Sequence, residues 1–361
     1  MFNEGFKYDV NNNNSFQEVI MKAIICTQYG PPNVLQLQNI EKPTPKKNEV
    51  LIKIHATSVT TGDCRIRGFN SPLLFWIPMR IILGFRKPRK PVLGVELSGE
   101  IEEVGTDVTQ FKKGDPIFAL TELNLGGYAE YTCVHESGLI TLKPTNVTYE
   151  EAAVIPFGGT SALHFLRKGR IKKGQQLLIY GASGSVGTAA VQLAKYFGAT
   201  VTAVCSNSNF ELVQSLGADK VIDYTKEDFT KQGKCYDIIF DAVGKYKKSL
   251  CTNTLTPNGK YVSVNGMMAK VSKEDMILLK KLVETEKLKP VIDRTYRLEE
   301  IAEAHMYVEK GHKKKECFDY PKIKYIQKII LTILFVRFTI STILKNYIHI
   351  LLSRVAEGLA R

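Results

Sequence analysis

Short apolar runs separated by turn residues dominate residues 21–144. Val50–His55, Ser98–Val104 and Tyr128–Val134 have the length and the branched or aromatic content that strands prefer. Between them stand turn formers such as Lys113–Pro116, where Gly, Asp and Pro come together. This pattern predicts a β-rich domain in the first part of the chain.

From Tyr149 to Val264 the pattern alternates between strands and helices. Gln176–Tyr180 and Thr200–Val204 are apolar runs of strand length, and Ser185–Phe197 between them has the apolar spacing of a buried helix. Three further strands are expected at Val221–Ile222, Asp237–Phe240 and Lys260–Val264. Strands that alternate with helices imply right-handed crossovers and a parallel sheet. The fold class is therefore α/β, and the second domain is a doubly wound parallel sheet.

The two ends of the chain differ from both domains. Residues 1–20 are polar, contain Asn11–Asn14 and predict a disordered extension without a secretory signal. Beyond two expected helices, Lys273–Glu286 and Leu298–Lys310, a lysine run opens a segment rich in Ile, Leu and Lys. No apolar run in this tail reaches the 18 residues that a membrane-spanning helix needs.

The composition is that of an ordinary globular protein with two domains. The chain has 361 residues, 44% hydrophobic and 24% charged, which excludes a collagen-like or disordered protein. The net charge of +13 could indicate nucleic acid or an anionic membrane, but residues 312–361 hold ten basic and three acidic residues. Since the rest of the chain is only mildly basic, no nucleic acid is expected, and peripheral membrane contact depends on whether the tail is genuine.

Seven cysteines are scattered along the chain. None forms a C-x-x-C pair, so neither a zinc ribbon nor a redox dithiol is indicated. Isolated cysteines are typical of a reducing compartment, and we expect a cytoplasmic protein.

A glycine-rich loop, Tyr180–Gly187, joins the first strand of the second domain to the helix that follows. Its spacing is Ala182-x-Gly184-x-x-Gly187, with Ala where the dinucleotide fingerprint usually has its first Gly. Gly184 would let the backbone approach a pyrophosphate, and Gly187 would let the helix pack close to the sheet. The alternative is a glycine-rich turn that binds nothing.

The end of the second strand bears on which nicotinamide cofactor is used. NAD enzymes place Asp or Glu about 20 residues after the glycine loop, whereas Val204–Asn209 contains only small polar groups and the first acid is Glu211. Ser206 and Asn207 can donate hydrogen bonds to a 2′-phosphate, so NADPH is favoured over NADH. Ordinary turn residues would give the same pattern.

Many segments in the same order resemble one enzyme family. The chain resembles the zinc-independent NADPH:quinone oxidoreductases, similar to zeta-crystallin, of the medium-chain dehydrogenase/reductase superfamily. The matching segments are Met21–Ile24, Tyr29–Pro32, Glu49–Lys53, Gly94–Glu100, Val104–Gly105, Phe111–Asp115, Gly127–Tyr131, Glu150–Ala153, Gly159–Ala162, Gly181–Gly187, Ser215–Tyr224 and Phe240–Gly244. The resemblance implies a GroES-like catalytic domain of residues 21–145 with about 267–315, a Rossmann NADPH-binding domain of residues 146–266, and an atypical tail at 316–361.

The resemblance also assigns candidate site residues. Those at the pyrophosphate would be Ala182, Gly184, Ser185, Val186 and Gly187. Those near the adenosine phosphate would be Ser206, Asn207 and Tyr224. Those at the nicotinamide half would be Thr160, Val243 and Gly266. The polar floor of the catalytic site would hold Thr60 and Asp63, although Asp63 could equally cap a turn.

Zinc is not expected. The zinc-dependent relatives carry Cys at the position of Thr60 and His at the position of Val95, and the lobe with four cysteines is missing. Cys64 lies four residues from the first ligand position and is better explained as a core residue.

The expected reaction is NADPH-dependent hydride transfer, without a metal, to small hydrophobic quinones or α,β-unsaturated carbonyl compounds. Negative charge then builds on the distal oxygen, and Thr60, Tyr128 or solvent could meet it. The competing hypotheses are a non-catalytic NADPH-binding module, structural or associated with RNA or membrane, and an alcohol dehydrogenase.

Three segments depart from the family pattern or leave alternatives open. Val264–Met268 runs almost directly into a helix, so a strand that often pairs across the family's homodimer is expected to be shortened or absent, which argues against the usual dimer. Lys314–Cys317 replaces the family's last strand, and the tail is either an interfacial basic segment or the product of a shifted reading frame. The apolar stretch Pro72–Phe85 forms either a lid over the substrate or a loop packed on the core.

Overall fold

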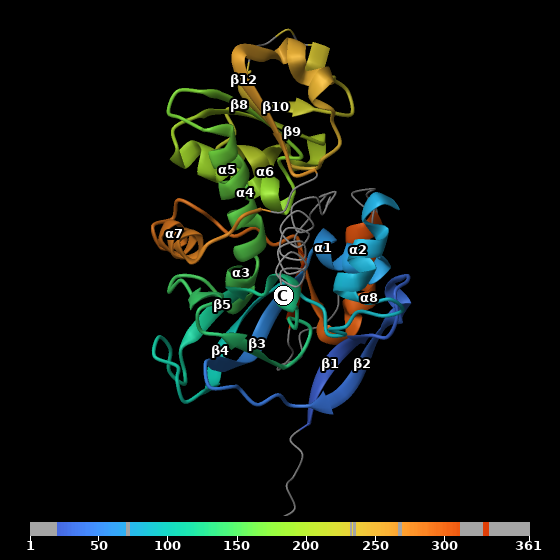
Figure 1. The fold of residues 1–361 in the computed structure, drawn as a ribbon. Helices are drawn as coiled ribbons and strands as arrows, with labels where there is room; N and C mark the ends of the chain where they lie inside the picture. Colours follow the sequence, from blue (N-terminus) through green and yellow to red (C-terminus); the bar gives the residue numbers. More distant parts are fainter. Residues whose placement is uncertain are drawn as a thin grey trace, which may run out of the picture.

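The computed structural model describes residues 20–69, 73–231, 233, 236–265, 269–310 and 328–331. The predicted extension at 1–20 lies, except for Ile20, outside the described residues, as does most of the tail. Figure 1 shows two domains stacked end to end, with helix α4 (Pro156–Gly169) running between them.

The lower domain is built on a mainly antiparallel sheet. Among the described residues this sheet has seven strands, ordered β13-β14-β3-β4-β5-β7, with β6 also paired to β3, and a separate β1-β2 hairpin. The strands are β1 (Ile20–Cys26), β2 (Leu35–Glu41), β3 (Glu49–Val59), β4 (Glu96–Val104), β5 (Pro116–Leu120), β6 (Tyr131–His135), β7 (Leu139–Leu142), β13 (Arg294–Arg297) and β14 (Lys328–Leu331). Alternate apolar residues of β3, β4 and β5 such as Ile52, Leu97 and Ile117 form a core of their own. The β-rich first domain is thereby confirmed.

Helices close the lower domain on its remaining sides. They are α1 (Thr61–Gly68), α2 (Leu73–Leu83), α3 (Tyr149–Ala153), α7 (Lys273–Glu284) and α8 (Ile301–Lys310). The stretch expected as a lid or a loop is thus largely helical, as α2. No described helix is long and apolar enough to cross a bilayer.

The upper domain holds the parallel sheet that the alternating pattern predicts. Its five described strands are ordered β10-β9-β8-β11-β12 and all neighbours are parallel. The elements are β8 (Gln176–Tyr180), α5 (Ser185–Tyr196), β9 (Thr200–Cys205), α6 (Phe210–Ser215), β10 (Lys220–Asp223), β11 (Tyr236–Asp241) and β12 (Leu255–Ser263). β12 begins earlier than expected and lies at the edge of the sheet.

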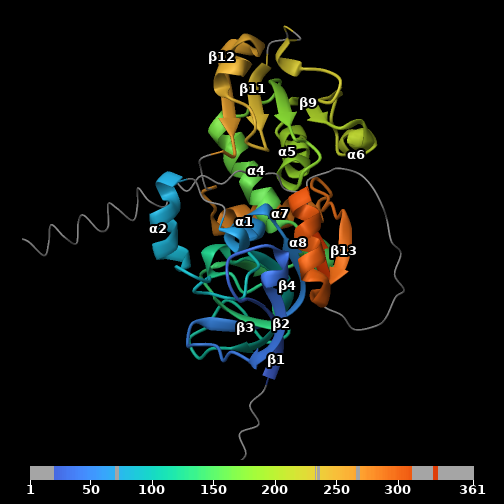
Figure 2. The same cartoon turned by 90° about the vertical axis from the view of Figure 1, so that its right-hand side faces the viewer.

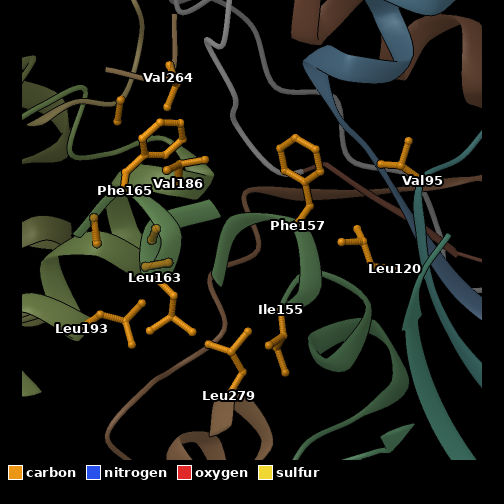
Figure 3. Packing of buried hydrophobic residues seen from close by; sticks show 14 of the residues in the cluster. Val95, Leu120, Ile155, Phe157, Leu163, Phe165, Val186, Leu193, Val264 and Leu279 are labelled. Carbon is orange, nitrogen blue, oxygen red and sulfur yellow. The ribbon is translucent and has the colours of Figure 1, made fainter. Parts of the chain in front are cut away.

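One hydrophobic core runs through both domains (Figure 3). Phe157 and Leu163 of α4 lie between Val95, the residue before β4, on one side and Leu193 of α5 on the other. Because buried apolar area is the main stabilising term, this shared core holds the two domains together along α4.

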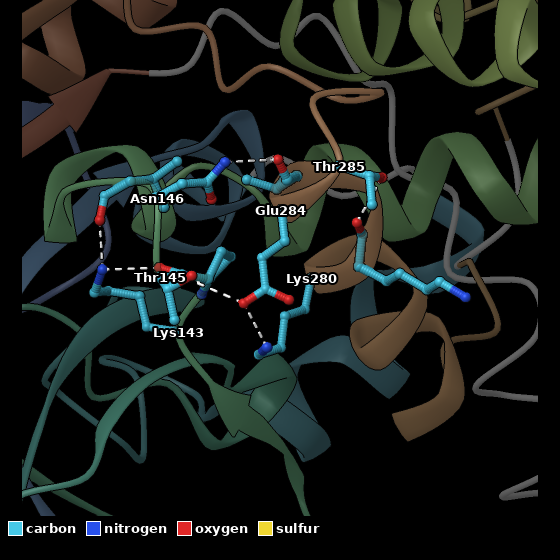
Figure 4. A network of polar contacts seen from close by, with 10 residues as sticks. Lys143, Thr145, Asn146, Lys280, Glu284 and Thr285 are labelled. Carbon is cyan, nitrogen blue, oxygen red and sulfur yellow. Dashed lines mark hydrogen bonds and ion pairs between the residues drawn. The ribbon is translucent and has the colours of Figure 1, made fainter.

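Polar contacts attach α7 to the lower domain (Figure 4). Glu284 accepts hydrogen bonds from the Thr145 N–H at 3.2 Å and the Lys280 amine at 2.6 Å. The Asn146 side chain donates to the Val283 carbonyl at 3.0 Å. The chain therefore returns to the lower domain after β12.

The last strand of the sheet comes from a part of the chain where the sequence does not predict one. β14 pairs in parallel with the end of β3, Leu331 opposite Val59, and antiparallel with β13. A segment of the tail, Lys328–Leu331, therefore supplies a strand of this sheet. The exact domain boundaries stay a prediction.

Candidate active site

A crevice for a nucleotide is expected where the order of the parallel strands reverses. β8 and β11 are neighbours, and their continuations lead outward to β9 and to β12. In open α/β sheets, ligands bind beyond the carboxyl ends of the strands at this point. Gly181 follows β8 with φ +77°, and a Cβ there would collide with the side chain of Val243, which follows β11. The two loops therefore meet at the crevice.

The N-terminus of α5 opens onto this crevice. Gly184 is the N-cap in an extended conformation, and in the described part of the chain no side chain caps the helix. A Cβ on Gly187 would lie 2.7 Å from the Cα of Ala182 and still closer to the Gly181 carbonyl, so only glycine allows this close packing. The amide groups of the first turn are left for an anion, which fits the pyrophosphate of a dinucleotide.

The three residues expected at the adenosine phosphate come together at the ends of β9 and β10. Ser206 and Ser208 share a hydrogen bond of 3.1 Å, and the Asn209 side chain donates to Ser206 at 3.0 Å. The N–H of Tyr224 donates to the Cys205 carbonyl at 3.3 Å, and its ring is 43% exposed. An aromatic face and small polar groups therefore line the same corner as Asn207.

Asp223 is a site residue that the sequence analysis missed. Its carboxylate accepts from the Thr225 hydroxyl at 2.7 Å and the Thr225 N–H at 2.9 Å, and the Asn207 N–H also donates to it. These hydrogen bonds, the Thr225 hydroxyl first, lower the pKa of Asp223. Asp223 is the last residue of β10, and β10 runs parallel to β9, so the two strands end at the same edge of the sheet. A search for acids at the end of the neighbouring strand would have found it. The corner therefore holds an acid although none directly follows β9.

The candidates at the nicotinamide half are only partly described. Thr160 lies in the first half of α4, is 1% exposed, and donates its hydroxyl proton to the Pro156 carbonyl at 2.6 Å. Val243 lines the crevice beside Gly181. Gly266 lies outside the described residues.

Thr60 and Asp63 form the start of α1. The Thr60 N–H and hydroxyl both donate to one oxygen of Asp63, at 2.9 and 2.6 Å, and the Asp63 N–H donates back to the hydroxyl at 3.2 Å. The other Asp63 oxygen accepts from the Gly94 N–H at 3.2 Å. This is a capping box, and both side chains are completely buried. The capping role considered for Asp63 is therefore present.

Tyr128 lies beside this cap. Burial raises the pKa of Asp63 to about 6 despite the hydrogen bonds from Thr60. Burial, and next the Asp63 carboxylate, raise the pKa of Tyr128 well above its ordinary value. The phenol interacts with Asp63 electrostatically, yet its oxygen has no partner of hydrogen-bonding geometry among the described residues. The Tyr128 hydroxyl is therefore buried and coupled to the Asp63 carboxylate beside it.

Glu96 is a second missed residue, one position after Val95. It is completely buried, and its carboxylate accepts from the Ser58 hydroxyl and from the Phe157 N–H, the latter at 2.7 Å. Burial raises its pKa to about 8, although both hydrogen bonds oppose the shift. Glu96 thus joins the lower sheet to the first turn of α4. The sequence pattern marks this motif as a family match and Val95 as a zinc ligand position, and it points to no role for Glu96.

A second buried polar cluster lies behind the floor. The Nδ1 atom of His305 lies 3.4 Å from the Cys64 sulfur and 3.3 Å from Nε of Arg67, whose guanidinium also pairs with Glu309. Burial lowers the pKa of His305 and raises the pKa of Cys64, so the imidazole is neutral and the thiol unreactive. In the described ranges no group of three Cys, His, Asp or Glu side chains could hold a metal ion.

Comparison with known families agrees with this architecture. The profile of the family described as alcohol dehydrogenase GroES-like domain matches residues 46–144. The profile described as zinc-binding dehydrogenase matches residues 185–288, and a second profile with that description matches residues 263–314.

Individual relatives are similar over most of the chain. A 2-methylene-furan-3-one reductase of Solanum lycopersicum is 34% identical, over 81% of this chain and 76% of the relative. A chloroplastic NADPH-dependent alkenal/one oxidoreductase of Arabidopsis thaliana is 33% identical, over 83% and 80%. The solved quinone oxidoreductase of Coxiella burnetii superposes with a TM-score of 0.73 at 28% identity, over 87% of this chain and 99% of that one.

Proposed function

Because this chain belongs to the medium-chain dehydrogenase/reductase superfamily, we propose that it is an NADPH-dependent reductase of quinones or α,β-unsaturated carbonyl compounds. The observation that carries the proposal is the open N-terminus of α5 at the strand-order reversal. The alkenal/one and quinone reductase relatives supply the substrate class.

Bound NADPH would supply a hydride to the acceptor, whose distal oxygen then gains an electron pair and takes up a proton. The amides of residues 185–187 would bind the pyrophosphate, while Ala182, Gly184, Ser185 and Val186 shape the turn. Thr160, Val243 and Gly266 would border the nicotinamide. Each of these roles orients a reacting group rather than taking part in bond making.

The polar floor would meet the charge that develops on the acceptor. The Tyr128 hydroxyl meets no partner in hydrogen-bonding geometry among the described residues, although Asp63 lies beside it, and we assign it the hydrogen bond to the distal oxygen. Thr60 and Asp63 hold each other and the start of α1, so they would orient the floor beneath this oxygen. The proton itself would come from Tyr128 or from solvent.

NADPH is proposed over NADH on the chemistry of the adenosine corner. Ser206 and Asn207 offer donors to a 2′-phosphate, and Tyr224 offers a ring to the adenine. Asp223 already accepts hydrogen bonds from Thr225 and Asn207, so its carboxylate is less available to bind the ribose hydroxyl that NADH would present.

We propose that no zinc takes part in the reaction. Val95 offers no ligand atom, and the Thr60 hydroxyl donates its proton to Asp63. Metal analysis of the purified protein tests this directly. A stoichiometric zinc ion required for turnover would return the protein to the alcohol dehydrogenase hypothesis.

We also propose that the protein is cytoplasmic and that it forms a homodimer. One relative is named as chloroplastic, so the compartment has to be measured for this chain. The edge strand β12 is the surface at which a second copy would extend the parallel sheet. Fractionation and analytical ultracentrifugation test these two points.

The decisive experiment is steady-state oxidation of NADPH and NADH by the full chain with a panel of quinones and enones. We expect the wild type to turn over with NADPH. In a Tyr128→Phe variant, kcat should fall more for enones than for quinones, because quinones are reduced more easily. Tight NADPH binding without turnover of any acceptor would support the non-catalytic module instead.

A further inference from the structure

Helix α2 is apolar on the side that faces solvent as well as on the side that faces the protein. Arg80 is its only polar residue. On the inner side, Met79 and Leu83 are buried in a small cluster with Phe69. The outer stripe is exposed: Trp76 by 42%, Ile77 by 64% and Ile81 by 52%, and it continues after the helix in Phe85 at 64%. Figure 2 shows α2 at one flank of the lower domain.

Arg80 does not give this outer face a polar character. Its guanidinium stacks 3.7 Å from the centroid of the Phe69 ring, 4.7 Å from that of Tyr29 and 4.8 Å from that of Trp76. It also donates to the Phe85 carbonyl. The cation is therefore held among the rings, where it supports Trp76, and the outer stripe stays purely apolar.

A basic rim adjoins the apolar stripe. Arg86, Lys87, Arg89 and Lys90 are exposed, and no Asp or Glu occurs between Asp63 and Glu96. None of these four cations makes an ion pair within the described part of the chain, and Lys90 donates only to the Asn124 side chain. The rim therefore has an uncompensated positive charge.

We propose that α2 and residues 84–90 dock the protein on an anionic lipid bilayer. The stripe of Trp76, Ile77, Ile81 and Phe85 enters the interface between headgroups and acyl chains, and the basic rim meets the anionic headgroups. Exposed aromatic and aliphatic residues beside clustered cations are the combination that interfacial binding requires.

The positive charge of the basic rim favours an anionic bilayer over a second copy of this chain as the binding partner. A symmetric contact through this face would bring two basic rims together, which opposes association. The attachment would also be independent of the tail, because the surface lies wholly within residues 76–90.

Trp76 makes the proposal directly measurable, since it is the only tryptophan of the chain. The full chain is mixed with vesicles of phosphatidylcholine alone or with added phosphatidylserine. We expect sedimentation with the anionic vesicles, a blue shift of the Trp76 emission and protection from acrylamide. Binding should weaken as salt is added, and vesicles of phosphatidylcholine alone should bind much less.

Two variants separate the apolar and the electrostatic contributions. Ile77→Ser/Ile81→Ser/Phe85→Ser and Arg86→Gln/Lys87→Gln/Arg89→Gln/Lys90→Gln should each weaken vesicle binding at least tenfold. Their matched controls, which should bind as the wild type does, are Leu37→Ser/Leu250→Ser/Ile277→Ser and Lys112→Gln/Lys113→Gln/Lys172→Gln/Lys173→Gln. The control residues are exposed as well. Unchanged thermal unfolding verifies that each variant is folded.

Several outcomes would overturn the proposal. Vesicle binding with no change in Trp76 emission would place the contact elsewhere, such as the basic tail. An equal loss in the controls would mean that overall charge or hydrophobicity, not this surface, drives binding. A wild-type dimer that the triple serine variant converts to a monomer would make a second copy the occupant.

Discussion

Helices α1 and α5 begin in opposite ways. At α1 the chain provides its own partners, since Thr60 and Asp63 satisfy each other and the Gly94 N–H. At α5 the N-cap is Gly184, and no described side chain caps the helix with a hydrogen bond. A buried helix end costs free energy unless its amides are satisfied, so the open end of α5 indicates a place kept for a ligand anion.

Helix α4 lies between these two cases. Its first turn receives a carboxylate from another element, because Glu96 of β4 accepts from the Phe157 N–H. The protein thus satisfies one helix end locally and one through tertiary contact, and leaves the third open at the place where we propose that the cofactor binds. The four predictions below test this difference.

The largest effect is expected for Gly187→Ala. The new Cβ would lie 2.7 Å from the Cα of Ala182 and still closer to the Gly181 carbonyl oxygen. Because both are backbone atoms, either α5 or the glycine loop must move. We expect unfolding to become easier by about 3 kcal/mol and NADPH binding to be lost. Urea denaturation and fluorescence titration measure both quantities.

Gly174→Ala is the control, since φ is +85° there but nothing lies within 4 Å of the new Cβ. That variant should cost only about 1 kcal/mol and keep NADPH affinity. Equal behaviour of the two variants would mean that close packing at Gly187 is unimportant.

Gly184→Asp would give α5 a cap like that of α1. The N-cap φ is −77° and ψ is 169°, which an aspartate adopts readily. We expect the helix to gain about 0.5 kcal/mol, while NADPH affinity falls roughly 100-fold because the carboxylate repels the phosphates.

Gly184→Asn separates charge from size, and should lose clearly less affinity than the aspartate variant. The difference between them should shrink as salt is raised. If both variants bind NADPH as the wild type does, the open end of α5 is not the phosphate site.

Asp63→Ala would open the end of α1. It leaves the N–H groups of Thr60 and Gly94 without their acceptor in a buried place. We expect a loss of about 2 kcal/mol in unfolding free energy, measured by urea denaturation. Asp228→Ala, which removes an exposed cap of Thr230, should cost less than about 1 kcal/mol. A smaller loss at Asp63 than at Asp228 would contradict the assigned role.

The smallest effect concerns pH. Since burial raises the pKa of Glu96 to about 8, the folded protein binds a proton that the unfolded chain releases at lower pH. The stability that this proton provides is complete below the unfolded pKa and is lost as pH rises toward about 8. In a Glu96→Gln variant, the loss of unfolding free energy over this pH range should be smaller by on the order of 1 kcal/mol. Urea unfolding at several pH values measures it. Identical pH slopes would show that Glu96 ionises normally.

Much of the architecture could be predicted from short-range patterns. The alternation after Tyr149 and the spacing of Ala182, Gly184 and Gly187 depend on neighbouring residues, and the parallel sheet follows from them. Asp223 and Glu96 could not be found in this way. Their importance arises from Asn207 on a neighbouring loop and Phe157 on a distant helix. The strand β14 likewise depends on its pairing with β3.

Torsional preference and hydrophobic spacing act within a few residues, so the fold class, the order of the elements and the glycine loop can be inferred from the amino-acid sequence. Which helix ends are satisfied and which side chains are buried depends on how distant segments pack. Tyr128 lies beside Asp63 across 65 positions of sequence, and burial shifts both pKa values. Burial and electrostatics depend on the whole surroundings of a group, so they are settled when distant segments pack together.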